Sequence, residues 1–122
     1  MDTIKKNRYK EYSYDGCAVE ASLELMGGKG KGVILYHLQE KTLRFNELQK
    51  KLISITPRML TKQLRELESS GLIKRKVYPE VPPKVEYSLS QSGIALNKVL
   101  KELKVWGDEY GIPLLNNKSV EK

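Results

Sequence analysis

The residues best suited to chemistry in this sequence are the arginines, lysines and hydroxyl side chains of segment 54–71. At about 100° per residue, Leu60, Leu64 and Leu67 form one apolar stripe, and the cations of the segment fall on the opposite side. An arginine on such a face can donate two hydrogen bonds to O6 and N7 of guanine, which a lysine does less rigidly. A charged face also keeps an ordinary surface helix in solution, so this segment alone does not decide between DNA binding and solvation.

The ends of the same segment predict a helix of defined length. Thr56 is a typical N-cap residue, Pro57 suits the first helical position, and Gly71 stands where a left-handed C-terminal cap is common. A helix that enters the major groove contacts base edges with its N-terminal half. Arg58 lies in that half.

Composition and charge limit the classes of partner. The chain of 122 residues has a formal net charge of +7, and residues 41–86 carry eleven Lys/Arg against five Asp/Glu, so most of the excess lies in the middle. A concentrated basic region favours nucleic acid. One domain is expected from the length. The single cysteine, the lack of a secretory signal and the lack of an apolar run near about 20 residues predict a cytoplasmic protein without an internal disulfide or a membrane partner.

The periodicity predicts elements in a definite order. Helices are expected over 17–26, 31–39, a segment ending at Leu52 with a capping box at Asn46 and Gln49, and 57–70. Strands 72–78 and 85–89 follow, joined by a proline-rich tip at 79–84. A last helix begins after Ser90 and is stopped by Gly111 and Pro113. We expect residues 1–15 to form a flexible arm, 16–111 the domain, and 112–122 a C-terminal tail.

This order predicts a winged helix-turn-helix, mainly α with a small β-hairpin wing, with added N- and C-terminal dimerisation helices. The last helix is too apolar for one surface element on so small a domain. We therefore expect a second copy to cover part of it and part of the 17–26 helix, most simply as a two-fold homodimer. The residues expected at this interface are Val19, Leu23, Leu96, Val99, Leu100, Leu103, Trp106 and Tyr110.

Five blocks of the chain carry a family resemblance: 17–20 (CAVE), 27–29 (GGK), 44–48 (RFNEL), 60–67 (LTKQLREL) and 78–89 (YPEVPPKVEYSL). In this order they resemble the HxlR-type winged-helix transcriptional regulators of bacteria and archaea. The resemblance implies a homodimer on a pseudo-palindromic operator, often beside genes for oxidoreductases or detoxifying enzymes. That family usually has Trp after Gly-Gly-Lys, where this chain has Gly30, so a packing hole is expected there.

The residues expected to contact double-stranded DNA come from three places. The helix presents Arg58, Thr61, Lys62 and Arg65 to base edges, and its N-terminus with Thr56 suits a phosphate. The wing brings Lys74, Arg75, Lys76 and Lys84 to phosphates or the neighbouring minor groove, and Arg44 is a further phosphate candidate. Gln63 lies off the cationic face and is a weaker candidate.

Cys17, the only cysteine, begins a helix, where free amides favour the thiolate, while Asp15 and Glu20 act in the opposite direction. From the residues alone, a structural and a sensing role both stay open. The family resemblance implies that a cysteine at this position senses quinones, aldehydes or oxidants. With one thiol per chain, the chemistry is limited to an intersubunit disulfide, a mixed disulfide with a small thiol, or alkylation.

Two other classes of function are weighed against DNA binding. A winged-helix module that docks a protein without reading DNA would need an exposed apolar patch in place of the cationic face. An enzyme is not expected, because we find no nucleophile–base pair, metal-ligand spacing or phosphate loop, and no cofactor is expected either. The only histidine, His37, is expected to pack in or against the core.

Overall fold

The computed structural model describes residues 14–117. Residues 1–13 of the predicted arm and 118–122 of the predicted tail lie outside this range. The helices of the first half are α1 (Cys17–Met26), α2 (Lys31–Leu38), α3 (Phe45–Lys51) and α4 (Pro57–Ser69). The strands are β1 (Leu43–Arg44), β2 (Ile73–Tyr78) and β3 (Lys84–Leu89). The C-terminal part consists of α5 (Gln91–Ala95), α6 (Asn97–Trp106), the π-helix η1 (Gly107–Gly111) and α7 (Ile112–Asn116). The predicted winged helix-turn-helix is confirmed.

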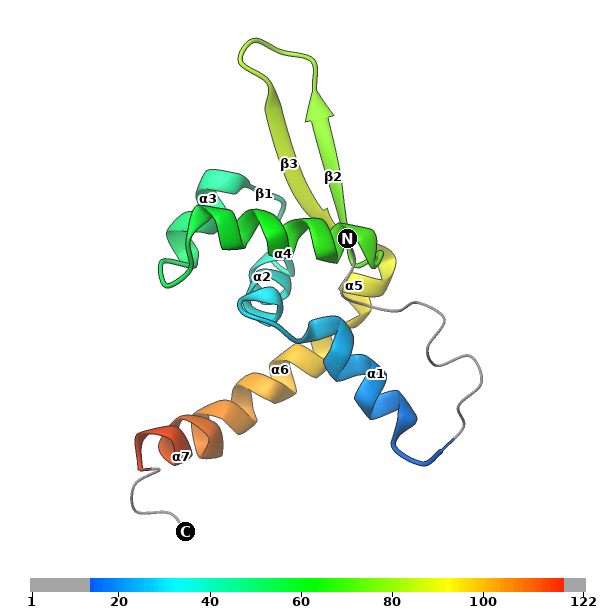
Figure 1. Cartoon of the computed structure of the whole chain (residues 1–122), viewed down its shortest axis with the longest axis vertical. Helices are drawn as coiled ribbons and strands as arrows, with labels where there is room; N and C mark the ends of the chain where they lie inside the picture. The colour runs from blue at the N-terminus through cyan, green and yellow to red at the C-terminus, as the bar shows by residue number, and fades with distance from the viewer. Residues whose placement is uncertain (1–13, 118–122) are drawn as a thin grey trace.

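The three strands form an antiparallel sheet in the order β1-β3-β2, in which the short strand β1 before α3 pairs with β3. Arg75 pairs with Tyr87 and Lys76 pairs with Glu86 across β2 and β3. Because side chains alternate along a strand, Arg75 and Tyr87 share one face, and Lys76 and Glu86 share the other. The hairpin projects well beyond the helices, and α4 runs across its base (Figure 1).

The local signals of α4 are confirmed. Leu60, Leu64 and Leu67 are buried, as the stripe predicts. The Oγ1 atom of Thr56 accepts a hydrogen bond of 3.0 Å from the Met59 N–H. Gly71 has φ +87°, and this left-handed turn ends the helix.

The capping box predicted for α3 is wrong. The helix begins at Phe45, and Glu47 caps it by accepting a hydrogen bond of 2.8 Å from the Arg44 N–H. Gln49 has another role: its Nε2 donates to the carbonyl oxygens of Leu52 and Ile55, at 3.3 and 2.9 Å. These two bonds close the turn that joins α3 to α4.

The predicted end of the last helix at Gly111 and Pro113 is also wrong, because the chain stays helical to Asn116. Proline lacks an N–H, and its ring clashes with the carbonyl four residues earlier in an α-helix. The wider π-helical turn immediately before Pro113 accommodates it. Gly111 is right-handed in conformation, and a Cβ built there would lie 3.2 Å from the Trp106 ring, so this glycine makes room for the indole.

The packing hole expected at Gly30 is absent from the described chain. Gly30 has φ +93°, and a Cβ built on it would lie 3.2 Å from both the Leu52 and the Ile55 side chains. These two residues belong to the hydrophobic core, which also contains the buried side chains of α2 and the buried stripe of α4. Their side chains fill the space that a larger side chain at position 30 would occupy.

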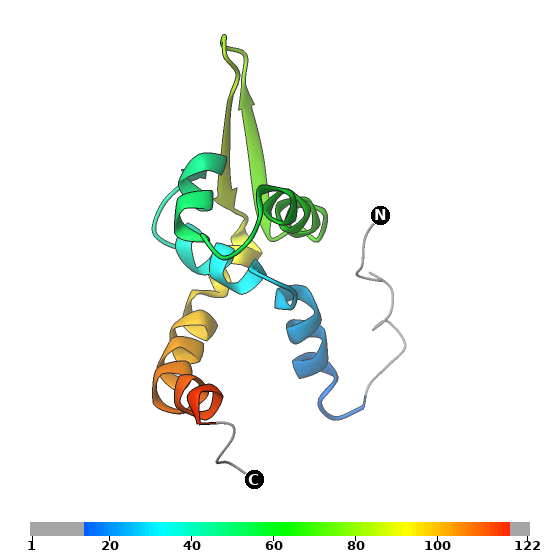
Figure 2. The same ribbon diagram turned by 60° about the vertical axis from the view of Figure 1, so that its left-hand side comes forward.

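The N- and C-terminal helices extend away from the wing as two diverging arms, α1 and the continuous rod of α6, η1 and α7 (Figures 1 and 2). No side chain of residues 17–26 is buried. In α6, Leu100 is buried in the core. Leu25 and Met26 of α1 also pack against the core, whereas most apolar side chains of the C-terminal rod are exposed.

Candidate nucleic-acid interface

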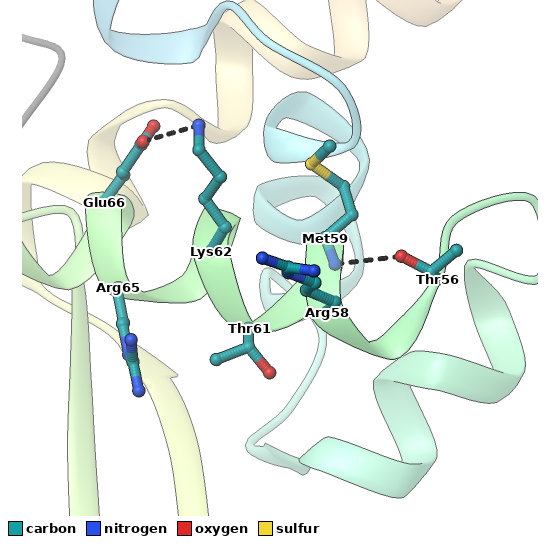
Figure 3. Close-up of a pocket in the computed structure, with 7 residues that line it drawn as sticks. All are labelled: Thr56, Arg58, Met59, Thr61, Lys62, Arg65 and Glu66. Carbon is teal, nitrogen blue, oxygen red and sulfur yellow. Dashed lines mark hydrogen bonds and ion pairs between the residues drawn. The ribbon is translucent and has the colours of Figure 1, made fainter.

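The exposed face of α4 presents two unengaged arginines. Arg58 and Arg65 are both exposed, and within residues 14–117 neither forms an ion pair. In Figure 3, Arg65 extends toward the two strands of the wing, whereas Lys62 extends away from them. Both guanidinium groups are free to meet a ligand.

Lys62 is not free in the same way. Its Nζ lies 2.9 Å from Oε2 of Glu66, one turn along α4, although the lysine side chain is 56% exposed (Figure 3). The other carboxylate oxygen of Glu66 lies 2.6 Å from the buried Nζ of Lys31 in α2. Desolvation raises the pKa of Glu66, but hydrogen bonds from Lys31 and Lys62 outweigh it and lower the pKa to about 2. Glu66 is thus ionised and holds two cations.

The two threonines expected at the interface use their hydroxyl groups within the helix. Thr56 accepts the capping hydrogen bond from Met59, and the Thr61 hydroxyl donates to the Pro57 carbonyl at 2.9 Å. The methyl group of Thr61 stays available for an apolar contact, such as a thymine methyl. Thr56 is exposed at the helix N-terminus, where a phosphate would meet free amides.

Gln63 faces inward. Its side chain is 3% exposed, and its Nε2 lies 3.2 Å from the sulfur of Met59. A Cβ on Gly28 would lie 3.5 Å from its Oε1, so the loop before α2 covers it. Gln63 is thereby excluded as a base-contacting residue.

The wing cations lie on two faces of the hairpin. Arg75 faces α4, and its Nε lies 3.2 Å from Oε1 of Glu68. Lys74 and Lys76 are exposed on the opposite face. The structure therefore does not bring Lys74, Arg75 and Lys76 together as one patch.

A small polar cluster orders the outer part of the wing. The Tyr78 hydroxyl donates to Glu86 at 2.9 Å, and the Nζ atoms of Lys76 and Lys84 lie 4.9 and 4.6 Å from the Tyr78 ring centroid. Lys84 Nζ is also 3.5 Å from Glu86 Oε2. The hydrogen bond from Tyr78, with Lys84 and Arg44 nearby, lowers the pKa of Glu86. Arg44 is exposed and is the cross-strand partner of Glu86.

The expected dimer residues lie on the two arms, with one correction. Val19 and Leu23 on α1, and Val99, Leu103, Trp106 and Tyr110 on the C-terminal rod, are exposed large hydrophobic residues. Leu100 was expected at the interface but is 5% exposed and belongs to the core, so that expectation is wrong. Leu96 is half-buried and packs against the same core.

Cys17 is the first residue of α1 and is half-buried, with a free thiol. Its N–H donates to the Tyr14 carbonyl at 3.1 Å. The Tyr14 hydroxyl in turn donates to Glu20, one turn into α1. Cys17 therefore lies on the exposed arm, close to Val19 and far along the chain from α4.

The buried pair Lys31–Glu66 and the contacts of Glu68 were missed from the sequence. The spacing of Lys62 and Glu66, four residues apart on one helix, was the available signal for part of this network. The partner Lys31 lies in another helix, and no local pattern indicates it. His37 is half-buried in α2 with its ring edge-on to Tyr36, consistent with the expected packing role.

A helix-turn-helix whose second helix presents free arginines, with a basic hairpin at its side, defines a winged-helix DNA-binding protein. A family model described as HxlR-like helix-turn-helix matches residues 25–114. The chain belongs to this family, and it is a DNA-binding transcriptional regulator.

Individual relatives and solved structures support the same assignment to a family of transcriptional regulators. The chain is 52% identical over 102 residues to the HTH-type transcriptional regulator YdeP of Bacillus subtilis (strain 168), covering 84% of this chain and 80% of YdeP. The solved structure of the redox regulator HypR in its reduced form is 46% identical with a TM-score of 0.76, covering 81% of this chain and 98% of HypR. The reduced transcriptional regulator YodB from B. subtilis is 34% identical with a TM-score of 0.68, covering 79% of this chain and 94% of YodB. These relatives are all described as regulators. Over residues 14–117, no helix has the length and apolar character to cross a bilayer.

Proposed function

We propose that two copies of this chain bind a pseudo-palindromic operator through α4 and the wing, and that modification of Cys17 changes this binding. The observation that carries the proposed operator binding is the distribution of cationic and apolar residues over the surface. Free arginines and wing cations lie on α4 and the hairpin, while most of the exposed large hydrophobic residues lie on arms that extend away from the wing. A dimer formed through the arms would leave both α4 helices open to DNA.

The test of this proposal uses the duplex that the wild-type protein selects from a random pool. We expect the selected sequence to contain two inverted half-sites whose centres are about one helical turn apart. Sedimentation of the complex should give two chains per duplex. One chain per duplex, or a selected sequence without two-fold symmetry, would contradict the proposal.

Arg58 is the residue we assign to base readout. Arg58→Ala should cost about 1–3 kcal/mol of binding to the selected duplex and relax the preference at one base pair in each half-site. The exposed Lys98 on α6 gives a matched control, because Lys98→Ala also removes one surface cation but lies on an arm. An equal loss for Arg58→Ala on random DNA would show that Arg58 contacts only phosphate.

The thiol part of the proposal is supported by the exposed arm that carries Cys17 and by the similarity of the chain to HypR, which is a redox regulator. With diamide, two Cys17 thiols from two subunits would lose two protons and two electrons to the reagent and form one S–S bond. With a quinone, the thiolate would add to the ring and form a C–S bond. Either product lies on α1, beside Val19, and would change how the arms meet.

The experiment compares operator binding by wild type and Cys17→Ser with and without each reagent. We expect a shift in the dissociation constant for wild type only. A non-reducing gel separates the intersubunit disulfide from a monomeric adduct, which mass spectrometry identifies. The same response in both proteins would show that Cys17 is structural.

A further inference from the structure

A crevice separates α4 from the wing. It is lined by Thr61, Leu64, Arg65, Glu68, Arg75 and Tyr87. The helix contributes the first four residues, and the last two are cross-strand partners on the face of the sheet that meets α4. The crevice thus lies between the two elements that are expected to enter neighbouring grooves of a duplex.

The crevice contains two guanidinium groups and one carboxylate. Arg75 is paired with Glu68 at 3.2 Å, but these side chains are 45% and 38% exposed, so the pair is weak and exchangeable. Arg65 extends toward the strands (Figure 3) and forms no ion pair within the described part of the chain. One positive charge in the crevice is therefore without a counter-charge.

Tyr87 lines the same crevice and carries a phenol hydroxyl group. Burial raises the pKa of Tyr87, and the nearby Arg75 opposes this only in part. The phenol stays protonated at neutral pH and can donate a hydrogen bond. The crevice therefore offers hydrogen-bond donors from the helix and from both wing strands.

The geometry of a duplex indicates what lies over this crevice. When α4 lies in the major groove and the wing meets the adjacent minor groove, one sugar–phosphate strand separates the two grooves and must cross the helix–wing junction. The guanidinium group of an arginine can donate two parallel hydrogen bonds to phosphate oxygens. We propose that the crevice is a binding site for one backbone phosphate, held by the guanidinium groups of Arg65 and Arg75 and by the Tyr87 hydroxyl.

This site rests on the proposed function, because only a bound duplex brings the strand to the junction. It assigns Arg65 to a phosphate, where the sequence pattern predicts a contact with a base edge. Glu68 limits binding of free anions, because it offsets one of the two positive charges.

The test uses duplexes of the selected sequence in which single phosphates are replaced by uncharged methylphosphonates, one position at a time. For wild type we expect one position in each half-site, between the α4 and wing contacts, at which replacement weakens binding about tenfold. Arg65→Ala should weaken binding to the unmodified duplex. The affinity of this variant should no longer fall when the phosphate at that position is replaced, because the free-energy effects of removing two groups that contact each other are not additive. Tyr87→Phe keeps the packed ring and should show a smaller change of the same kind.

Arg58→Ala is the control and should keep the full sensitivity at that position. Full sensitivity in both Arg65→Ala and Tyr87→Phe would overturn the phosphate site while leaving operator binding intact. A loss for Arg65→Ala that depends on the identity of one base pair would also overturn it. If the wild-type protein selects no duplex, the proposed function fails and the phosphate site fails with it.

Discussion

The ammonium group of Lys31 in α2 lies 2.6 Å from a carboxylate oxygen of Glu66 in α4, and the two side chains are 3% and 9% exposed. This buried pair ties α4 to α2 in the centre of the fold. The second carboxylate oxygen holds Lys62 on the surface of α4. Glu66 therefore connects an internal cation to an external one, and the two connections should differ in strength.

Removing the buried cation should be costly. Lys31→Met removes the buried cation that is paired with Glu66, and breaking a buried pair typically destabilises by about 3–5 kcal/mol. Lys62→Met removes only the exposed partner and should cost under about 1 kcal/mol. Urea unfolding at one protein concentration measures both variants. Similar losses for the two would show that burial does not set the strength of this network.

The lowered pKa of the same carboxylate predicts that the free energy of unfolding decreases at acid pH. The folded pKa of Glu66, about 2, lies below its ordinary value of 4.5, so the folded state binds fewer protons in this range. The contribution of Glu66 is complete above about pH 4.5 and is lost as pH falls toward 2. Thermal unfolding between pH 2 and 6 should show this loss in wild type. In Glu66→Gln that component of the pH dependence should disappear, and a profile parallel to wild type would contradict the pKa.

The exposed wing lysines should act through charge. Lys74 and Lys76 point away from α4, so neutralising them should not change sequence preference. Each substitution, Lys74→Gln or Lys76→Gln, should reduce the slope of log affinity against log salt by about 1. Lys101→Gln on the α6 arm is the control and should leave the slope unchanged. If the wing variants match that control, the outer face of the wing does not touch DNA.

The arms offer a matched pair of substitutions that tests the proposed dimer. On the α6 helix, Leu103 lies on the same side as Val99 and Trp106, whereas Val105 falls on the opposite side, and both Leu103 and Val105 are about half exposed. Leu103→Lys should convert the dimer to a monomer and weaken operator binding more than tenfold, because one chain loses its linked partner. Val105→Lys should leave both properties near wild type. Analytical ultracentrifugation and gel shift measure them, and a dimer that survives Leu103→Lys excludes this face.

Local chemistry determined much of the fold. The cap at Thr56, the proline after it, the leucine stripe and Gly71 define α4 through local interactions, so the sequence alone predicted its bounds to within one residue. Alternation predicted the second wing strand to within one residue, and it indicated the first strand less cleanly. The exposed position of Arg58 and Arg65 followed from the same stripe, because burying one face of a helix exposes the other.

Only the tertiary structure decided which of these side chains are free. Lys31 and Glu66 are far apart in sequence, and their pairing depends on how α2 packs against α4. Gln63 is buried because the loop at Gly28 covers it, and Leu100 is buried because α6 begins against the core. The helix continues past Pro113 because a π-helical turn makes room for the ring. In each case a contact or backbone geometry outside the local pattern set the outcome, whereas the sequence pattern reports only the side of an element on which a residue lies.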